Sequence, residues 1–461
     1  MTRHRPSPGF LVASRLFLYR NNMTLAVLLT GAVAAPAFAQ TAPAPAATTA
    51  APTAAPPAPA AAPTSPPPGL WIDGIHIYAQ GEAGIVLNPY RPSDGLNFGQ
   101  LFTDHANQFQ LNQILLTATK PLDSSVAGYS TGFKLQFMYG SDARYTHFLG
   151  ELDRVTSDRY QMDIVEANGL LHTPWLFTGG IDFKAGQYST PLGYETIDPT
   201  GNPFYSHSYI FNFGLPLKHT GLLATAHVSP LLDVYMGGDT GNQTSFGYGG
   251  ENNSAGAFLG GVGLNLMGGN LTILALTHFG PENATRALSP LGFNANGYYR
   301  FYNDITATWK ATDKLTLTTE ANLVRDDFGA TGYSTGNPSA ANGFGVAQYV
   351  SYTLTDTVTA NLRAEIWRDD NNFFVGAYPT NLGPDQALGG YPTTVISASG
   401  PTTYGEITVG ITYKPNMPPP FSGLMIRPEV RWDHAYTNNH PFNAGASNNV
   451  ATIASDIVLD F

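Results

Sequence analysis

The sequence predicts an all-β fold: a transmembrane antiparallel β-barrel of about 16 strands, with short periplasmic turns and long extracellular loops. Three observations predict it, namely the final strand, the composition and the spacing of the connections. In the final strand, Phe461, Leu459 and Ile457 share one face, whereas Asp460 and Asp456 share the other. Successive side chains of a strand point to opposite faces, so this strand has one mainly apolar face and one mainly polar face.

The composition agrees with a barrel. Gly 49, Tyr 24 and Phe 26 are high for 461 residues, only 12% of residues are charged, and the mean hydropathy of −0.10 is too polar for a helical membrane protein. A barrel exposes only every second residue to lipid, so its hydropathy signal is weak. The chain has no cysteine. This excludes a disulfide framework, a thiolate nucleophile and a Cys-ligated metal.

The N-terminal region predicts export. Arg15 and Arg20 precede an apolar run that ends at Ala35, and Ala37-Phe38-Ala39 is a small-x-small cleavage motif. Residues 1–39 are therefore expected to form a signal peptide. Translation from Met1 supplies a basic segment before the apolar run, and a start at Met23 stays open.

The segment that follows has no means of forming a core. Residues 40–69 are rich in Ala and Pro, which predicts a disordered periplasmic linker. Residues 70–461 are expected to form the barrel. Residues 1–68 hold four Arg and no acidic residue, so the remaining chain has 18 basic and 33 acidic residues and a charge near −15. An acidic excess of this size argues against nucleic acid as a partner.

Period-two alternation marks 16 strands along the chain. The runs are 74–88, 107–119, 131–140, 160–170, 179–188, 218–228, 231–240, 255–266, 270–279, 299–310, 314–325, 343–353, 357–368, 402–413, 423–434 and 450–461. Tight turns follow the sixth, eighth, tenth and twelfth runs, and the connections between these turns are long. Alternating short and long connections are typical of a transmembrane barrel with both termini on the turn side. A soluble β-rich protein is the alternative, but no repeat at a propeller period is present.

Three short motifs between residues 185 and 221 match those of a known protein family. They are Thr190-Pro191-Leu192-Gly193-Tyr194-Glu195, the stretch from Phe204 to Tyr209, and His219-Thr220-Gly221. These motifs resemble the putative β-barrel porin family called OmpL-like. The resemblance implies a porin in the outer membrane of a Gram-negative bacterium, with passive passage of solutes.

The matched segment is also the third long connection of the barrel. In 16-stranded general diffusion porins this connection folds into the lumen, so we expect residues 189–217 to form an aromatic constriction loop. Its fixed turns and apolar surface fit that role. The candidate residues of this loop are Thr190, Pro191, Gly193, Tyr194, Glu195, Phe204, Tyr205, His207 and Tyr209.

Charged residues on the polar faces of the strands are the second candidate feature. Opposed acids and bases in a lumen set a transverse field and a selective constriction. The alternative is that neighbouring charges neutralise one another and only keep the interior wet. The candidate lumen charges are Arg363, Glu365, Arg427, Glu429, Arg431 and Asp433. Aromatic residues near strand ends are expected in the interfacial girdles, although any single one could line the pore instead. They are Tyr298, Tyr299, Trp309, Tyr352, Trp367, Tyr413 and Trp432.

The sequence predicts no enzyme, no catalytic residue, no cofactor and no metal site. His207 and His219, with the nearby Glu195 and Asp198, form the one local cluster that offers a base or metal ligands. We favour hydrogen bonding that holds the loop as their role.

The function expected from the sequence is an outer-membrane porin for passive diffusion of small hydrophilic solutes. The alternative is a surface-exposed binding or structural barrel with a closed lumen, and a barrel hydrolase is a third, weaker interpretation. The expected partners are outer-membrane lipid, small hydrophilic solutes and the barrel-assembly machinery, with Phe461 as the assembly signal. A homotrimer is expected only by analogy with other 16-stranded porins.

Overall fold

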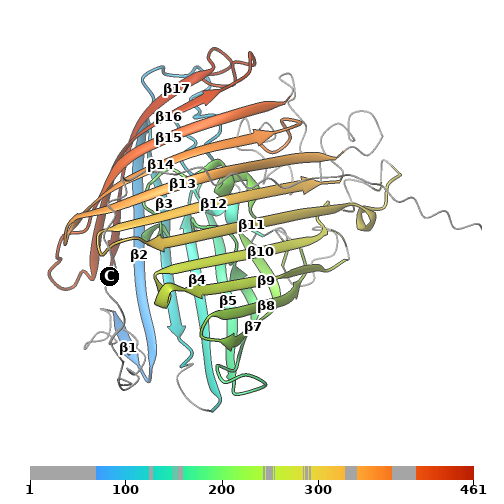
Figure 1. Cartoon of the computed structure of the whole chain (residues 1–461). Helices are drawn as coiled ribbons and strands as arrows, with labels where there is room; N and C mark the ends of the chain where they lie inside the picture. Colours follow the sequence, from blue (N-terminus) through green and yellow to red (C-terminus); the bar gives the residue numbers. More distant parts are fainter. Residues whose placement is uncertain are drawn as a thin grey trace, which may run out of the picture. The chain divides into compact units, whose positions relative to one another are not determined.

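The computed structural model describes residues 69–461 apart from 124–127, 149–150, 153–158, 242–243, 246–252, 254, 284, 286–288, 290–291, 328–339 and 376–400. The signal peptide and nearly all of the linker expected from the sequence lie outside the described residues. Within them, 16 antiparallel strands form the barrel (Figure 1). They are β2 (Ile75–Leu87), β3 (Phe109–Lys120), β4 (Ser130–Gly140), β5 (Gln161–Thr173), β6 (Ile181–Ser189), β7 (Lys218–Ser229), β8 (Leu232–Asp239), β9 (Ala257–Leu266), β10 (Leu271–Pro281), β11 (Tyr299–Lys310), β12 (Leu315–Asp326), β13 (Ala341–Thr355), β14 (Val358–Asp369), β15 (Thr402–Tyr413), β16 (Gly423–Ala435) and β17 (Asn449–Asp460).

The barrel closes between its last and first long strands. Each strand pairs with its neighbour in sequence, and β17 pairs with β2 from Ile453↔Leu87 to Asp460↔Gln80. Phe461 extends this seam, because its N–H donates to Ala79 O at 2.9 Å. A short additional strand, β1 (Leu70–Ile72), pairs with the start of β2. Closure gives every strand two partners, as a hydrocarbon environment requires.

The helical elements are short and lie in the connections. They are α1 (Ala143–Thr146), η1 (Pro199–Gly201), η2 (Ile210–Gly214), η3 (Met267–Gly269) and η5 (Ala295–Gly297). Within the described ranges, each helix falls short of the length and apolarity that a membrane span requires.

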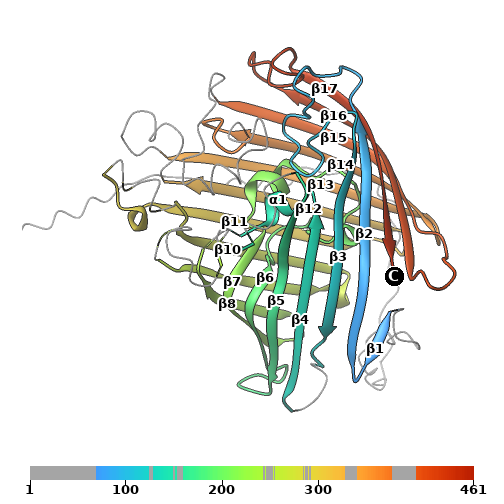
Figure 2. The ribbon, with the colours of Figure 1, turned by 180° about the vertical axis from the view of Figure 1, so that it is seen from behind.

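The connections alternate in length as predicted. The shortest are at 230–231, 267–270, 311–314 and 356–357, all at one end of the barrel, which we call the turn side. Three others on the turn side are longer, at 121–129, 174–180 and 414–422. The opposite end, the loop side, carries the long connections, including residues 88–108 and 141–160 (Figure 2).

Burial follows the pattern of a membrane barrel, in which apolar side chains are exposed on the outside and polar side chains are buried inside. On β14, Leu362 and Ile366 are 36% and 52% exposed, whereas Arg363 and Glu365 are 0% and 6% exposed. Apolar side chains thus point outward and charged side chains point inward, opposite to a soluble protein. This pattern confirms the barrel and excludes the soluble β-rich alternative.

One aromatic residue was assigned to the wrong face. Trp367 was expected in an interfacial girdle, but its side chain is completely buried and shares the inner face of β14 with Arg363 and Glu365. Two glycines make room for the ring, since a Cβ on Gly214 or Gly343 would come within 2.9 Å or 2.7 Å of it. Trp309, Tyr352, Tyr413, Trp432 and Tyr299 are all exposed by 39% or more, as a girdle requires.

Because the outer face of the barrel is apolar, we expect a charged residue on that face to lower the free energy of unfolding. Val409 lies in the middle of β15 and is 48% exposed. Val409→Arg should destabilise the folded barrel in lipid vesicles by about 2–4 kcal/mol, because a charge near the bilayer midplane loses its hydration. Urea titration of the refolded protein measures this difference, with Val409→Leu as the control. Equal stability of the two variants would show that this face does not contact lipid.

Candidate functional site

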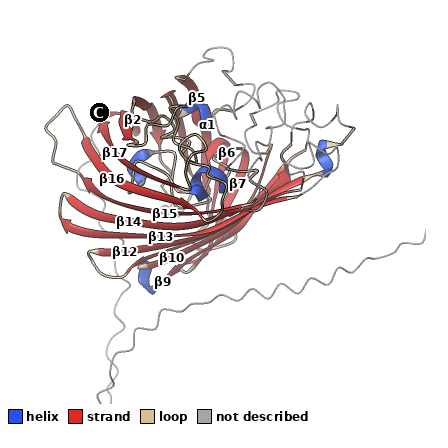
Figure 3. Cartoon of the chain, turned by 90° about the horizontal axis from the view of Figure 1, so that it is seen from above, coloured by secondary structure: helices blue, strands red, loops and turns tan. Residues whose placement is uncertain are grey.

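The connection between β6 and β7, residues 190–217, folds into the barrel, and we call it the inner loop. Its base is closed by Thr190 N, which donates to Leu217 O at 2.9 Å. Its helix η2 contacts strands β12 and β13. Figure 3, in which the chain is seen from above, shows some of the short helices within the curve of the strands.

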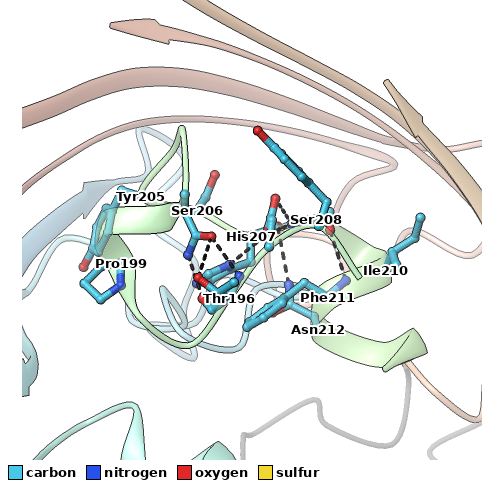
Figure 4. Close-up of polar contacts among 12 residues, drawn as sticks. Thr196, Pro199, Tyr205, Ser206, His207, Ser208, Ile210, Phe211 and Asn212 are labelled. Carbon is cyan, nitrogen blue, oxygen red and sulfur yellow. Dashed lines mark hydrogen bonds and ion pairs between the residues drawn. The ribbon is translucent and has the colours of Figure 1, made fainter. Parts of the chain in front are cut away.

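Local hydrogen bonds set the shape of the inner loop. Asn202 closes the turn at residues 196–202, since its side chain accepts from Thr196 N at 2.8 Å and donates to Thr196 O at 2.7 Å. Asp198 caps η1 by accepting from Thr200 N at 3.0 Å. Ser208 Oγ accepts from Phe211 N at 3.0 Å at the start of η2 (Figure 4). Short polar side chains at these positions satisfy the free N–H groups of each helical turn.

Two wall carboxylates receive the backbone of the inner loop. Glu365 of β14 accepts from Tyr209 N at 2.6 Å and from Ile210 N at 2.8 Å. Glu429 of β16 accepts from Tyr205 N at 2.9 Å and from Ser206 N at 3.2 Å. A hydrogen bond within a folded protein contributes about 0.5–1.5 kcal/mol of net stability. Two acidic side chains on the wall therefore fix the central segment of the loop.

Three wall arginines bind the carbonyl groups of the same segment. Arg363 Nη1 donates to Ser206 O at 2.7 Å, and Arg431 Nη1 donates to His207 O at 2.6 Å. Arg427 Nη1 donates to the carbonyls of residues 199 and 202 at 2.8 Å and 2.9 Å. Each guanidinium also pairs with a wall acid, namely Glu406, Asp433 and Asp456 respectively. Asp433 in turn accepts from the Tyr209 hydroxyl at 2.9 Å.

The structure shows where the six candidate lumen charges lie relative to the inner loop. All six candidate lumen charges point inward, but they lie beneath the inner loop and are at most 6% exposed. Sequence alternation identified the face on which they lie. It carried no information about the segment that covers them.

Glu195 joins the loop to itself and to the wall. Its carboxylate lies 2.8 Å from Arg363 Nη1 and 2.7 Å from His207 Nδ1, and it accepts from the Tyr349 hydroxyl at 3.0 Å. Burial raises the pKa of Glu195, but Arg363 and His207 outweigh this effect and lower it from 4.5 to about 2. The folded pKa lies below the unfolded value. The stabilisation from this group is therefore complete above pH of about 4.5 and is lost as the pH falls toward 2.

Aromatic side chains pack the inner loop against other connections. His207 and Phe211 stack with ring centroids 4.1 Å apart, and Phe102 lies 5.0 Å and 5.4 Å from their rings. Tyr209 stacks on Tyr404 of β15 at 5.1 Å. Phe102 belongs to the first long connection, which therefore also reaches into the lumen. These residues belong to one buried cluster that includes side chains from several sides of the barrel.

The remaining candidate residues lie at the start of the loop and in its middle. Gly193 has φ +87°, and a Cβ there would come within 2.3 Å of Leu215, so glycine is required. Tyr194 N donates to Glu320 Oε1 at 3.2 Å, and the Tyr194 ring lies 4.5 Å from that of Tyr349. Phe204 is buried beneath Arg363, whose guanidinium carbon lies 5.2 Å from its ring centroid. Thr190 and Pro191 lie at the start of the loop, half-buried.

The local His and acid cluster expected from the sequence separates into three places. His207 pairs with Glu195, while Asp198 accepts from Gln80 of β2 at 3.2 Å. His219 instead lies beside Asp239, 3.1 Å away. Asp239, Glu406 and Asp456 were not identified from the sequence as partners, because strand pairing and loop docking bring them in from distant positions. The sequence indicates only that these three residues occupy alternating positions whose side chains point into the barrel.

A polar pocket lies below the inner loop on the turn side. It has a volume of about 230 Å³ and lies between the loop at residues 200–203 and wall residues that include Asn361, Thr412 and Lys414. Asn361 and Thr412 also reach the loop, since each donates to Pro203 O, at 3.4 Å and 3.2 Å.

A closed 16-stranded barrel with an apolar exterior, a charged interior and an inward-folded connection defines the class of outer-membrane β-barrels. A family model described as "Putative beta-barrel porin-2, OmpL-like" matches residues 74–461, and the chain belongs to this family. The family resemblance noted in the sequence is thereby confirmed. No curated protein matches the chain.

Solved porin structures share the fold. OmpF of Salmonella typhi, in complex with daunomycin, is 9% identical with a TM-score of 0.51, and the match covers 85% of this chain and 99% of that one. An anion-selective porin from Comamonas acidovorans gives 9% identity and a TM-score of 0.51, with coverage of 84% and 99%. The outer membrane channel DcaP of Acinetobacter baumannii gives 14% identity and a TM-score of 0.48, covering 86% and 100%. At these identities, the first two similarities establish the fold alone.

The contacts of Glu195 predict that the amides of the inner loop exchange hydrogen faster when the charge of Glu195 is removed. Glu195→Gln removes the carboxylate that pairs with His207, and it leaves the buried Arg363 with Glu406 as its remaining acidic partner. Breaking a buried ion pair in this way costs about 3–5 kcal/mol. Hydrogen exchange measured by mass spectrometry on refolded protein should show faster exchange for peptides covering residues 204–212. Asp313→Asn, in an exposed turn, is the control and should leave exchange unchanged. Unchanged exchange in Glu195→Gln would contradict the docking role.

Proposed function

We propose that this protein is an outer-membrane porin through which small hydrophilic solutes diffuse passively, and that the inner loop narrows the passage. The observation that carries the proposal is the docking of residues 199–210 on the inner wall by Glu365, Glu429 and the three wall arginines. A loop held in this way reduces the cross-section while leaving the barrel wall intact. Size selection follows from what remains open beside it.

The lining of the barrel supports a hydrophilic solute. Inward positions on β12, β14 and β16 carry Asn, Thr, Glu, Asp and Arg, and the pocket below the inner loop is lined mainly by Thr, Asn and Asp side chains. Such a lining offers hydrogen bonds in place of those that a solute makes with water. An apolar solute gains nothing from it.

The charge balance supports a preference for cations. The chain after residue 68 carries a net charge near −15, and the wall arginines that would oppose this charge are neutralised by acids beneath the loop. We therefore expect acidic groups to dominate the field that a permeating ion meets in the lumen.

A closed-lumen barrel with a surface-binding or structural role is the second candidate. One observation favours it: the inner loop, the 88–108 connection and Tyr145 of α1 join in a single buried aromatic cluster within the lumen. Under this proposal, the long connections on the loop side recognise a partner and no solute crosses.

Several expectations about assembly belong to the same proposal. The chain would be exported through its signal peptide and inserted by the barrel-assembly machinery, with Phe461 in the recognised position. Phe461 is 45% exposed, and its ring lies 5.5 Å from that of Phe421 at the turn-side end. An accessible aromatic side chain at the closing seam is compatible with recognition during assembly. Assembly as a homotrimer would follow the analogy with other 16-stranded porins.

Deletion of part of the inner loop tests the passage directly. Replacing residues 200–212 with a short Gly-Ser bridge removes the segment that the wall charges hold, so single-channel conductance in a planar bilayer should rise. Heat-modifiable mobility on gels controls for folding of the barrel. If neither the wild-type protein nor the deletion conducts, the passage proposal fails and the closed-lumen proposal replaces it.

Removal of two of the wall arginines that bind the inner loop tests the ion selectivity of the passage and the position of the loop. Arg427→Ala with Arg431→Ala deletes two positive charges, three hydrogen bonds to carbonyls of the inner loop, and the ion pairs of these arginines with wall acids. Conductance should rise, and the reversal potential in a salt gradient should shift further toward cations. Low salt should enlarge the shift, because the Debye length grows from about 8 Å to about 30 Å at 0.01 M.

The control for this double variant removes two positive charges from arginines that do not contact the inner loop. Arg325 and Arg368 each pair with a nearby aspartate at the loop-side ends of their strands, and their side chains are 45% and 30% exposed. Arg325→Ala with Arg368→Ala should change conductance much less. Equal effects from the two pairs would show that net charge alone, rather than loop docking, sets the conductance.

A further inference from the structure

Three buried side chains from three strands converge near the base of the inner loop. They are His219 of β7, Asp239 at the end of β8 and His278 of β10, and all three side chains have 0% exposure. His219 Nδ1 lies 3.1 Å from Asp239 Oδ2, and His278 Nε2 lies 3.1 Å from Asp239 Oδ1. One potential ligand atom from each residue lies within 4.8 Å of the others.

The hydrogen bonding of this cluster is incomplete. His219 Nδ1 points at Asp239 without making a hydrogen bond, although its side chain is fully buried. The hydroxyl of Tyr188, whose ring lies 5.6 Å from that of His219, also has no hydrogen-bond partner among the described residues. Buried polar atoms are rarely left in this state, so each one requires an explanation.

A second histidine cluster on the turn side provides a contrast. His227 Nδ1 bonds Asp233 at 2.7 Å, and His227 Nε2 bonds Asp182 at 3.3 Å. Both nitrogens of His227 are therefore satisfied by carboxylates, and its side chain is 31% exposed. The His219 cluster differs in being closed to solvent and in leaving a ring nitrogen directed at the shared carboxylate.

We propose that His219, Asp239 and His278 form a binding site for a divalent first-row transition ion, with zinc as the best fit. Two imidazoles and one carboxylate are a ligand set that zinc accepts, with bonds of about 2.0–2.2 Å. The two histidine–carboxylate separations of 3.1 Å match those of neighbouring ligands around an ion with such bonds. The three ligand atoms lie within 4.8 Å of one another, so the two imidazole rings draw closer together when an ion binds. A bound ion takes the free electron pair of His219 Nδ1 and supplies the partner that this atom lacks.

The surroundings of the ligands fit the same arrangement. His219 Nε2 lies 2.9 Å from Thr190 Oγ1, so an Nε2–H can donate to Thr190 while Nδ1 faces the ion. His278 Nδ1 lies 3.9 Å from Glu282 Oε1 while Nε2 faces Asp239. Ligand histidines in proteins commonly hold their second nitrogen with a hydrogen bond, as Thr190 can hold that of His219, whereas the 3.9 Å between His278 Nδ1 and Glu282 Oε1 is too long for a hydrogen bond.

The position of the site connects it to the inner loop. Thr190 begins the loop and His219 follows its end by two residues, and Thr190 N and Leu217 O close the base between them. An ion held by His219 therefore fixes the point where the loop leaves and rejoins the wall. Thr190 acts here as a positioning residue.

The experiment is zinc loading during refolding of the full chain. Chelator-treated, denatured protein is refolded in detergent with Zn²⁺, passed through a desalting column, and analysed by mass spectrometry for metal per folded chain. We expect about one zinc ion per chain for the wild-type protein and for the control His227→Gln, and loss of zinc for His219→Gln and His278→Gln. Thr190→Val should weaken zinc binding by about 10–100-fold, as expected for a residue that orients a ligand.

A thermal measurement protects the test against variants that fold poorly. Zinc should raise the temperature at which the wild-type barrel loses its heat-modifiable mobility, since a ligand bound only to the folded state stabilises it. The same shift should be absent in Asp239→Asn, which keeps the shape of the side chain. Wild-type chains that fold without retaining zinc would overturn the proposal. Retention of zinc by folded His219→Gln or His278→Gln would also overturn it.

Discussion

The hydrocarbon core of a bilayer offers no hydrogen-bond partners, and this constraint determines most of the structure. It requires each strand to be paired on both sides, which the seam between β17 and β2 completes. It also directs apolar residues such as Ile366 outward and charged residues such as Arg363 inward. The lumen therefore collects the charges of the barrel. Those charges need partners of their own, and the backbone of the inner loop supplies them.

The inner loop is held mainly by charges acting on main-chain groups, in addition to aromatic packing. Each wall arginine that binds a loop carbonyl also binds a wall acid, as Arg431 binds both His207 O and Asp433. Burying such pairs adds little net stability, because desolvation offsets their attraction. These pairs fix the position of the inner loop, because a shifted loop leaves several buried charges without partners. The network therefore specifies one location for the loop more strongly than it stabilises the barrel.

The sequence predicted the strands well and the site only partly, for a physical reason. A strand facing lipid on one side must alternate, so the alternation of β14 and β16 was visible along the chain, and with it the inward direction of Arg363 and Glu429. Trp367 was assigned to the wrong face because aromatic residues occur both in girdles and in the lumen. The partners of His219 could not be found, because the register of β7 with β8 places Asp239 beside it and His278 comes from β10, three strands away. The motif Thr190–Glu195 identified the inner loop, but only the fold shows which wall it covers.

The number and strength of the docking contacts also bear on how solutes could pass. Five wall side chains make eight hydrogen bonds to backbone groups of the inner loop. At about 1 kcal/mol for each, releasing them together costs on the order of 8 kcal/mol. A cost of this size favours a loop that stays docked on the wall. Passage, under the porin proposal, therefore goes beside a stationary loop, and a solute is selected by size and charge in a gap of fixed dimensions.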